Sequence, residues 1–445
     1  MENGMDFENA SDSEYDEIIE EYETDLEEDE FEEIIPLKDD AKFVLSGHSN
    51  VVLSVVCDSK TRVAFTGGMD DTIIAWNLEN GKQIDMLHGH SESITKLSIN
   101  CTDSFLVSGD LCGYVIVWKL IFDEMKFIKF KSIEVSEIID FKWMIDSSSK
   151  EEFLYICDKT GTVQSFSIGN LSDESSSEML STFYNQGKGC CCNGFNVILT
   201  GNTSAVLYGG SCEQSHEECS NRNELNLCDV NTYNMVKIDL NSIANEEEDN
   251  DEGLGAGFAT NKLNNSEMIA IGDWSQIILA CAVYNGQNIN CKLNRIAIKD
   301  GGLVTNVAFS DILPYLAFAS KNGIIGVYDL SHNRIRYMWN YMSTVPTAMQ
   351  ESKNEYEEQS TVSQLKWSHG KPVFYTSGLD GRLCCWDGRI NPSGDVPTWW
   401  GHSGIVWDMF VTKNDSCVVT ASEDKTGRET WFNVFWNEKN LGIRN

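Results

Sequence analysis

Three histidines recur in one local context that could support acid–base chemistry. Each follows a glycine, in the pairs Gly47-His48, Gly89-His90 and Gly401-His402. An aspartate stands at the same later position in two of the copies, Asp70 after His48 and Asp424 after His402. The corresponding position after His90 holds Cys112, so we expect that pair to be broken. Because a catalytic pair would not be repeated with its acid missing in one copy, we predict that these residues hold turns in a repeated fold.

Cysteine is the second residue type that could do chemistry, and the chain has 15. An odd number without a secretory signal favours a reducing compartment. Five cysteines lie in apolar, strand-like runs, where we expect small buried side chains: Cys57, Cys281, Cys384, Cys385 and Cys417. One segment holds four potential zinc ligands, Cys212, His216, Cys219 and Cys228. Their spacing is not that of a recognised zinc finger, so we predict no metal.

Sequence motifs that mark catalytic sites are absent. The chain has no P-loop, no zinc-protease motif and no nucleophile-elbow motif. The stretch from Gly253 to Gly257 lacks a surrounding strand–loop–helix unit, so we interpret it as a connection between strands. We predict no catalytic residues, no cofactor and hence no enzyme activity. A hydrolase or an oxidoreductase is the alternative class, and it would need a pocket with perturbed titratable groups.

A repeat predicts the elements that position these residues. Residues 47–78 and 89–120 both begin with Gly-His, contain three apolar runs separated by turns, and place a tryptophan in the third run. Histidine and tryptophan are 28 residues apart in each, from His48 to Trp76 and from His90 to Trp118. This pattern is typical of the blades of a WD40 β-propeller. Weaker copies cover residues 133–168, 192–230, 254–285, 303–330, 362–388 and 401–436.

Eight units predict an all-β fold, a WD40 β-propeller with eight blades, or with seven if the fourth or fifth unit is misassigned. Residues 41–46 precede the first unit, and the last unit ends after three strands. We therefore expect the strand 41–46 to complete the last blade, which removes an exposed sheet edge. The propeller domain then covers residues 41–445.

The spacing within the units identifies residues of the blade interior. A tight-turn residue precedes the closing aromatic by six positions in several units, as from Asp380 to Trp386. From Asp424 to Trp431 the gap is seven, so we expect one extra residue in that turn. We expect the closing tryptophans to be core residues: Trp76, Trp118, Trp386 and Trp431. Of the neighbours Trp399 and Trp400, alternation along a strand predicts that only one is buried.

The net charge of −36 restricts the partners of this chain. Half of it lies in residues 1–40, which hold 19 acids and one base, and which we expect to form a disordered acidic tail. A chain with this net negative charge is expected to bind poorly to nucleic acid or to an anionic membrane surface. No apolar run is long enough for a membrane-spanning helix. We expect the protein to be a monomer in the cytoplasm, and a location in the nucleus as well is the alternative.

Acidic residues gather where the repeat predicts one face of the propeller. Acidic inserts at residues 242–253 and 346–360 join consecutive units, and a polar insert at 212–223 interrupts the fourth unit. Such joints lie on the same face as the tight turns. We predict an acidic rim for binding a basic protein segment, formed by Asp71, Glu92, Glu134, Asp273, Asp300, Glu355, Glu357 and Glu358. The alternative is that these are solvated loops of an acidic protein.

Several segments resemble a known family. They are GDLCGYVIVWKL within residues 89–120, and AFASKNGIIGVYDLSHNRIRYMW, YTSGLDGRLCCWD and VVTASEDK within residues 303–435. With the acidic tail and the order of degenerate units, these segments are similar to the angio-associated migratory cell protein family. That family includes the fungal dedicated chaperone of a large-subunit ribosomal protein. The resemblance implies an eight-bladed propeller whose acidic face holds the basic N-terminal segment of that client until it joins the pre-60S particle.

These observations favour a non-enzymatic binding protein, a dedicated chaperone of a large-subunit ribosomal protein in 60S ribosome assembly. The alternative is a WD40 scaffold in signalling, cell migration or trafficking with no ribosomal client, because animal members of the family are linked to migration and signalling. Electrostatic capture of a basic segment should weaken steeply with added salt.

Overall fold

The structure is a computed structural model. The described residues are 36, 38–145, 152–160, 162–167, 179–183, 191–200, 203–211, 224–229, 235–240, 257–263, 266–285, 288–341, 362–391 and 396–431. They belong to the second of two units of the chain, Pro36–Asn445, and the first unit is Met1–Ile35. Residues 1–35 of the predicted tail, the inserts 212–223, 242–253 and 346–360, and Glu355, Glu357 and Glu358 lie outside the described residues.

The described residues form eight antiparallel sheets of four strands each. The first two sheets contain β2 (Val52–Cys57), β3 (Val63–Gly68), β4 (Ile73–Asn77) and β5 (Lys82–Leu87), then β6 (Ile94–Ile99), β7 (Phe105–Asp110), β8 (Tyr114–Ile121) and β9 (Lys126–Glu134). The next two contain β10 (Ile138–Ile145), β11 (Glu152–Asp158), β12 (Val163–Ser167) and β13 (Met179–Phe183), then β14 (Cys191–Thr200), β15 (Thr203–Ser211), β16 (Glu224–Asp229) and β17 (Met235–Asp239).

The second half repeats this order. The fifth and sixth sheets contain β18 (Phe258–Leu263), β19 (Ser266–Asp273), β20 (Gln276–Asn285) and β21 (Asn288–Ala297), then β22 (Val304–Phe309), β23 (Tyr315–Ser320), β24 (Ile324–Asp329) and β25 (Arg334–Asn340). The seventh contains β26 (Val362–Trp367), β27 (Val373–Gly378), β28 (Leu383–Asp387) and β29 (Thr398–Trp399), and the last contains β30 (Val406–Val411), β31 (Cys417–Ser422), β32 (Thr426–Trp431) and β1 (Phe43–Ser46).

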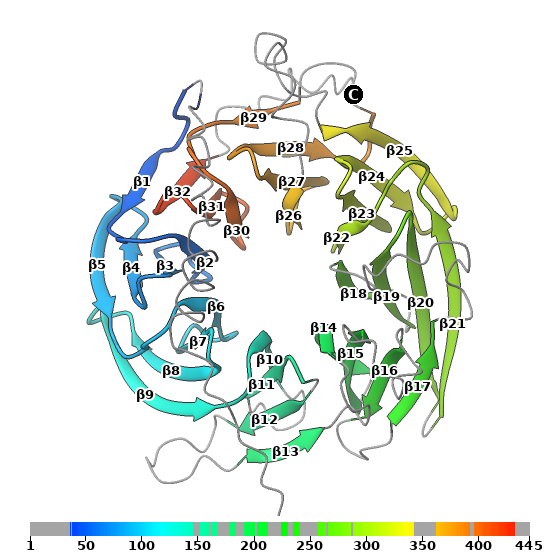
Figure 1. The fold of residues 1–445 in the computed structure, drawn as a ribbon, viewed down its shortest axis with the longest axis horizontal. Helices are drawn as coiled ribbons and strands as arrows, with labels where there is room; N and C mark the ends of the chain where they lie inside the picture. Colours follow the sequence, from blue (N-terminus) through cyan, green and yellow to red (C-terminus); the bar gives the residue numbers. More distant parts are fainter. Residues whose placement is uncertain are drawn as a thin grey trace, which may run out of the picture. The chain divides into compact units, whose positions relative to one another are not determined.

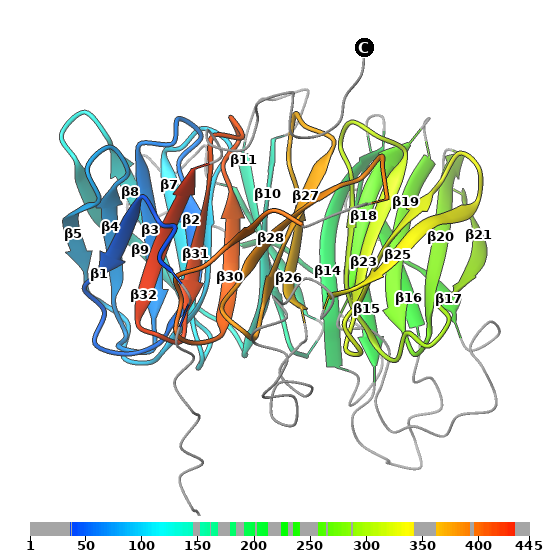
Figure 2. The ribbon, with the colours of Figure 1, turned by 90° about the horizontal axis from the view of Figure 1, so that it is seen from above.

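Figure 1 shows these sheets arranged around a common axis, with the first strand of each sheet innermost and the fourth at the perimeter. Figure 2 shows the strands running between two opposite faces of the ring. The predicted all-β propeller is confirmed, and its sheets number eight. None of the described residues forms a helix long and apolar enough to cross a membrane.

The N-terminal strand closes the ring. β1 pairs with β32 in antiparallel register, from Phe43 opposite Glu429 to Ser46 opposite Thr426. Contacts with the neighbouring sheets begin before β1, because the backbone N–H of Asp40 donates to the carbonyl of Trp400 at 2.8 Å. The outer edge of β32 is therefore covered by the chain itself, so the last sheet does not expose it for pairing with another molecule.

The core consists of side chains packed between neighbouring sheets. β3 is buried along its whole length, because sheets cover both of its faces, whereas β5 at the perimeter exposes its first two residues. The sheets approach so closely that Gly67 has no room for a side chain: a Cβ there would lie 2.5 Å from Cγ2 of Ile94 in the next blade. Across the same junction, the rings of Phe65 and Phe127 pack edge to face at 5.1 Å.

Candidate functional site

A chain of hydrogen bonds ties the tight turn of the first blade to its interior. The indole N–H of Trp76 donates to Oγ1 of Thr66 at 2.7 Å, and that hydroxyl lies 2.8 Å from Nε2 of His48. Nδ1 of His48 lies 2.9 Å from Oδ1 of Asp70, whose other oxygen accepts from the N–H of Ser49. A neutral imidazole with its proton on Nδ1 satisfies every donor and acceptor in this chain. The turn between β3 and β4 is thereby fixed to the segment before β2.

The second blade contains the same chain, so the prediction of a broken pair is wrong. Nδ1 of His90 lies 2.9 Å from Asp110, and Nε2 lies 2.7 Å from Oγ of Ser108. The indole of Trp118 donates to the same Oγ at 2.8 Å. The acid is Asp110, the last residue of β7, two positions before Cys112. Its carboxylate accepts a hydrogen bond from the backbone N–H of Cys112. The carboxylate thus reaches the histidine from the strand end rather than from the turn.

In the last blade, Nδ1 of His402 lies 2.8 Å from Asp424 and Nε2 lies 2.7 Å from Oγ1 of Thr420. The prediction of one extra residue in this turn is wrong. Thr430 stands opposite Val418 in the register. In the first blade, Trp76 stands opposite the equivalent residue Ala64. Thr430 therefore takes the closing position, and Trp431 follows it in β32, with its side chain outside the described residues.

The seventh blade replaces the histidine with a tyrosine. The fully buried Tyr341 donates its hydroxyl to Oδ1 of Asp380 at 3.0 Å, and Trp386 donates to Oγ1 of Thr376 at 2.8 Å. Arg382, also buried, donates from Nε to Oδ2 of Asp380 at 2.6 Å. Its guanidinium lies 5.4 Å from the ring centroid of Trp400, while Trp399 is buried. Sequence spacing did not indicate Tyr341 or Arg382, because neither residue type belongs to the Gly-His pattern.

The buried histidines predict that the folded state loses stability in acid. Burial lowers the pKa of His90 and of His402, and outweighs the hydrogen bonds to Asp110 and Asp424, which raise it. Below pH ~6.5 the unfolded chain then binds protons that the folded chain does not. We expect the free energy of unfolding to be highest above that pH and to fall between pH 7 and 5.

A second loss follows at lower pH. Burial raises the pKa of Asp424, but hydrogen bonds from His402, Thr426 and Ser403 outweigh it and bring the pKa to about 2. The stability from this carboxylate is present above pH ~4 and disappears as the pH falls towards 2, a loss of about 2 kcal/mol.

Urea unfolding of the wild type at pH 7, 5 and 3 measures both losses. In the variant His402→Gln the dependence between pH 7 and 5 should be shallower, whereas His88→Gln, which changes an exposed histidine, should retain it. A dependence between pH 7 and 5 that is as steep in His402→Gln as in the wild type would contradict this assignment, because the raised pKa of His369 acts on the wild-type stability in the opposite direction.

The five described acids of the predicted rim lie in connections, or at the strand ends next to them, on one face of the ring. Asp71 and Asp273 lie at the turns between the second and third strands, and Glu92, Glu134 and Asp300 lie at connections between sheets. Antiparallel order places both kinds of connection on the same face, which we call the acidic face. Asp71 lies close enough to His90 for its charge to oppose the lowering of that histidine's pKa by burial. Glu92, Glu134 and Asp300 are exposed, and Asp71 and Asp273 are partly exposed.

Exposed apolar side chains lie on the same face, and no pattern in the sequence indicated them. Met69 and Leu111 occupy the turns of the first two blades and are 42% and 51% exposed. Trp407, in the second position of β30 in the neighbouring last blade, is 42% exposed. The two turn positions follow no periodicity, so only the fold shows that they share a face with Trp407. The acidic face can therefore contact both charged and apolar side chains of a ligand.

The described residues offer no alternative site with metal chemistry. Within them, no three His, Cys, Asp or Glu side chains are grouped as metal ligands. Of the four potential zinc ligands, Cys212, His216 and Cys219 lie outside the described residues, and Cys228 lies in β16 with its side chain undescribed. Cys57, Cys384 and Cys417 are buried, while Cys281 and Cys385 are partly exposed.

Comparison with known proteins agrees with the repeat and the ring. The model for the WD domain, G-beta repeat, matches residues 40–77, 81–119, 350–387 and 395–428. Together with the sheets around a common axis, these repeats define the class: the chain is a WD40 β-propeller.

Within that class the chain is similar to angio-associated migratory cell protein. The Homo sapiens protein is 22% identical over 399 residues, which cover 87% of this chain and 79% of the relative, and the Canis lupus familiaris protein is also 22% identical. The resemblance predicted from the sequence is confirmed.

Solved structures of Sqt1 share the fold. Sqt1 from Chaetomium thermophilum, in a crystal structure bound to the N-terminus of the ribosomal protein L10, has a TM-score of 0.68 at 18% identity. The match covers 89% of this chain and all of that one. Saccharomyces cerevisiae Sqt1 has a TM-score of 0.66 at 16% identity.

Proposed function

We propose that this propeller is a non-enzymatic chaperone that captures a basic segment of a newly made large-subunit ribosomal protein. The observation that carries the proposal is the acidic face, on which separate turns and joints each contribute a carboxylate. The likeness to Sqt1, solved with the N-terminus of ribosomal protein L10, supports a ribosomal segment as the ligand. The N-terminal segment of L10 is therefore the first client to test.

The proposed mechanism is electrostatic capture followed by local packing. Acids in several loops of one face produce a summed negative potential that steers a Lys/Arg-rich segment towards it. Ion pairs at the rim fix the orientation of the segment and mask its charge from RNA. Met69, Leu111 and Trp407 provide apolar surface for uncharged side chains of the same segment. The hydrogen-bonded turns hold these groups in place before the ligand arrives, which reduces the entropy lost on binding.

Client capture during synthesis distinguishes this function from that of a scaffold without a ribosomal client. We propose that the protein acts as a monomer in the cytoplasm, where its client is made. Affinity capture of the protein with translating ribosomes, followed by sequencing of the bound messengers, should enrich the messenger of one large-subunit ribosomal protein. Enrichment should disappear after puromycin releases the nascent chains. Capture without any ribosomal-protein messenger would refute the chaperone function and favour a scaffold.

A further inference from the structure

A pocket on the perimeter, between the fifth and sixth blades, has the opposite charge character to the acidic face. Its volume is about 650 Å³, within the usual range of ligand sites. Three cations line it: Lys292 and Arg295 on β21, and Arg334 at the start of β25. The eleven lining residues include no aspartate or glutamate. In a chain of net charge −36, this local excess of positive charge requires an explanation.

The three cations are available to a ligand. All are exposed, and within the part of the chain that the structure describes none forms an ion pair. The acid next to the pocket, Asp329, is buried and already paired with Arg336 at 3.2 Å and with His332 at 3.0 Å. Because Asp329 is already paired, the positive charge of the pocket can be neutralised only by an acid outside these described residues.

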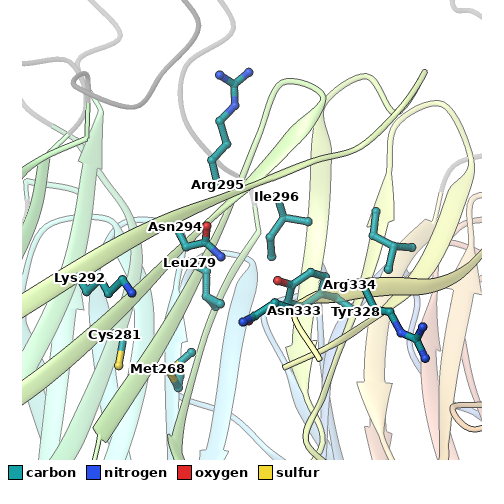
Figure 3. Close-up of a pocket in the computed structure, with 11 residues that line it drawn as sticks. Met268, Leu279, Cys281, Lys292, Asn294, Arg295, Ile296, Tyr328, Asn333 and Arg334 are labelled. Atoms are coloured by element: carbon teal, nitrogen blue, oxygen red, sulfur yellow. The ribbon is translucent and has the colours of Figure 1, made fainter. Parts of the chain in front are cut away.

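The base of the pocket is apolar and the charges stand at its edge. Met268, Leu279 and Ile296 belong to the core between the two blades. The ring of Tyr328 is buried beside them, and its hydroxyl hydrogen-bonds to Asn294. Figure 3 shows the side chains of Lys292, Arg295 and Arg334 spread around the pocket and pointing in different directions rather than converging on one point. Separated charges suit several carboxylates along a chain better than one phosphate group, which needs converging donors.

We propose that this pocket binds an acidic peptide segment of a partner protein, with one aliphatic side chain on the apolar base and flanking carboxylates on Lys292, Arg295 and Arg334. The site is separate from the acidic face, because the pocket lies at the perimeter and includes the turn between β24 and β25. That turn is on the opposite face from the turn between β23 and β24. The protein then has two binding surfaces of opposite charge, and one molecule can bind a basic client and an acidic partner together.

Fluorescence anisotropy with a labelled peptide tests the proposal, using the full chain at low salt. The probe is a heptapeptide with a central leucine between acidic residues. The variant Arg295→Glu/Arg334→Glu should weaken its binding at least ten-fold, whereas Lys60→Glu/Lys82→Glu, an equal charge change at exposed lysines of the first blade, should leave it unchanged. A probe with serine in place of leucine should bind several-fold more weakly.

Three results would overturn the proposal. They are no binding of the leucine probe by the wild type, equal binding by the pocket variant, and full displacement of the probe by inorganic phosphate, which would identify a small-anion site. Equal melting temperatures of the variants exclude misfolding as the cause of lost binding. Binding of a basic peptide by the pocket variant should equal that of the wild type, so failure of this proposal is distinguishable from failure of the proposed chaperone function.

Discussion

Reversing two charges on the acidic face, in the variant Glu92→Lys/Glu134→Lys, is expected to weaken binding of a basic ribosomal-protein peptide at least ten-fold. Both side chains are exposed: Glu92 lies in the connection after β5, and Glu134 is the last residue of β9, next to the following connection. Each substitution replaces an attraction with a repulsion. The association rate should fall as well, because long-range steering depends on the summed potential of the face. Stopped-flow fluorescence and calorimetry measure the rate and the affinity.

The matched control changes the same net charge on the opposite face. Glu79 and Asp123 are exposed in the turns between the third and fourth strands of the first two blades. The variant Glu79→Lys/Asp123→Lys should bind the peptide within about two-fold of the wild type at physiological salt, where the Debye length is about 8 Å. If the two variants lose affinity equally, only the overall charge matters and the acidic face is not a site.

The second large effect concerns closure of the ring. Leu45 is fully buried in β1, in the core shared by the first and last blades, so Leu45→Ala should lower the free energy of unfolding by about 2–5 kcal/mol. The cost combines the lost burial of the side chain with the cavity that it leaves. Chemical denaturation of the full chain, followed by tryptophan fluorescence, measures this change.

Its control is the preceding residue of the same strand. Val44 is 39% exposed on the other side of β1, so Val44→Ala should cost less than about 1 kcal/mol. Equal stabilities of the wild type and Leu45→Ala would show that β1 does not complete the last blade in solution.

The fold could be predicted from the sequence because each blade repeats its own pattern. Gly-His, the apolar runs and the closing tryptophan recur at fixed spacing, and each buried strand is covered by its neighbours in a similar way. Departures from the pattern were predicted less well. The acid of the second blade was predicted to be missing because Cys112 holds its position, although Asp110 at the strand end reaches His90.

Residues that meet only through packing of neighbouring sheets could not be predicted. Tyr341, which follows β25, reaches Asp380 of the next sheet without a shared motif. The basic pocket likewise combines Lys292 and Arg295 with Arg334, which belongs to the next sheet and lies far along the chain. The acidic rim was more accessible to prediction, because strand order alone assigns a turn or joint to one face. Its role in binding stays a proposal.

Binding of the N-terminal L10 peptide to the full chain at increasing salt tests the central proposal most directly. Binding should be measurable at 50 mM salt, with an affinity at least ten-fold lower at 300 mM, because ions screen the attraction between the acidic face and the peptide. A peptide of the same composition in scrambled order should bind more weakly, since Met69, Leu111 and Trp407 add contacts that depend on order. No binding at 50 mM, or an affinity independent of salt, would contradict electrostatic capture by the acidic face.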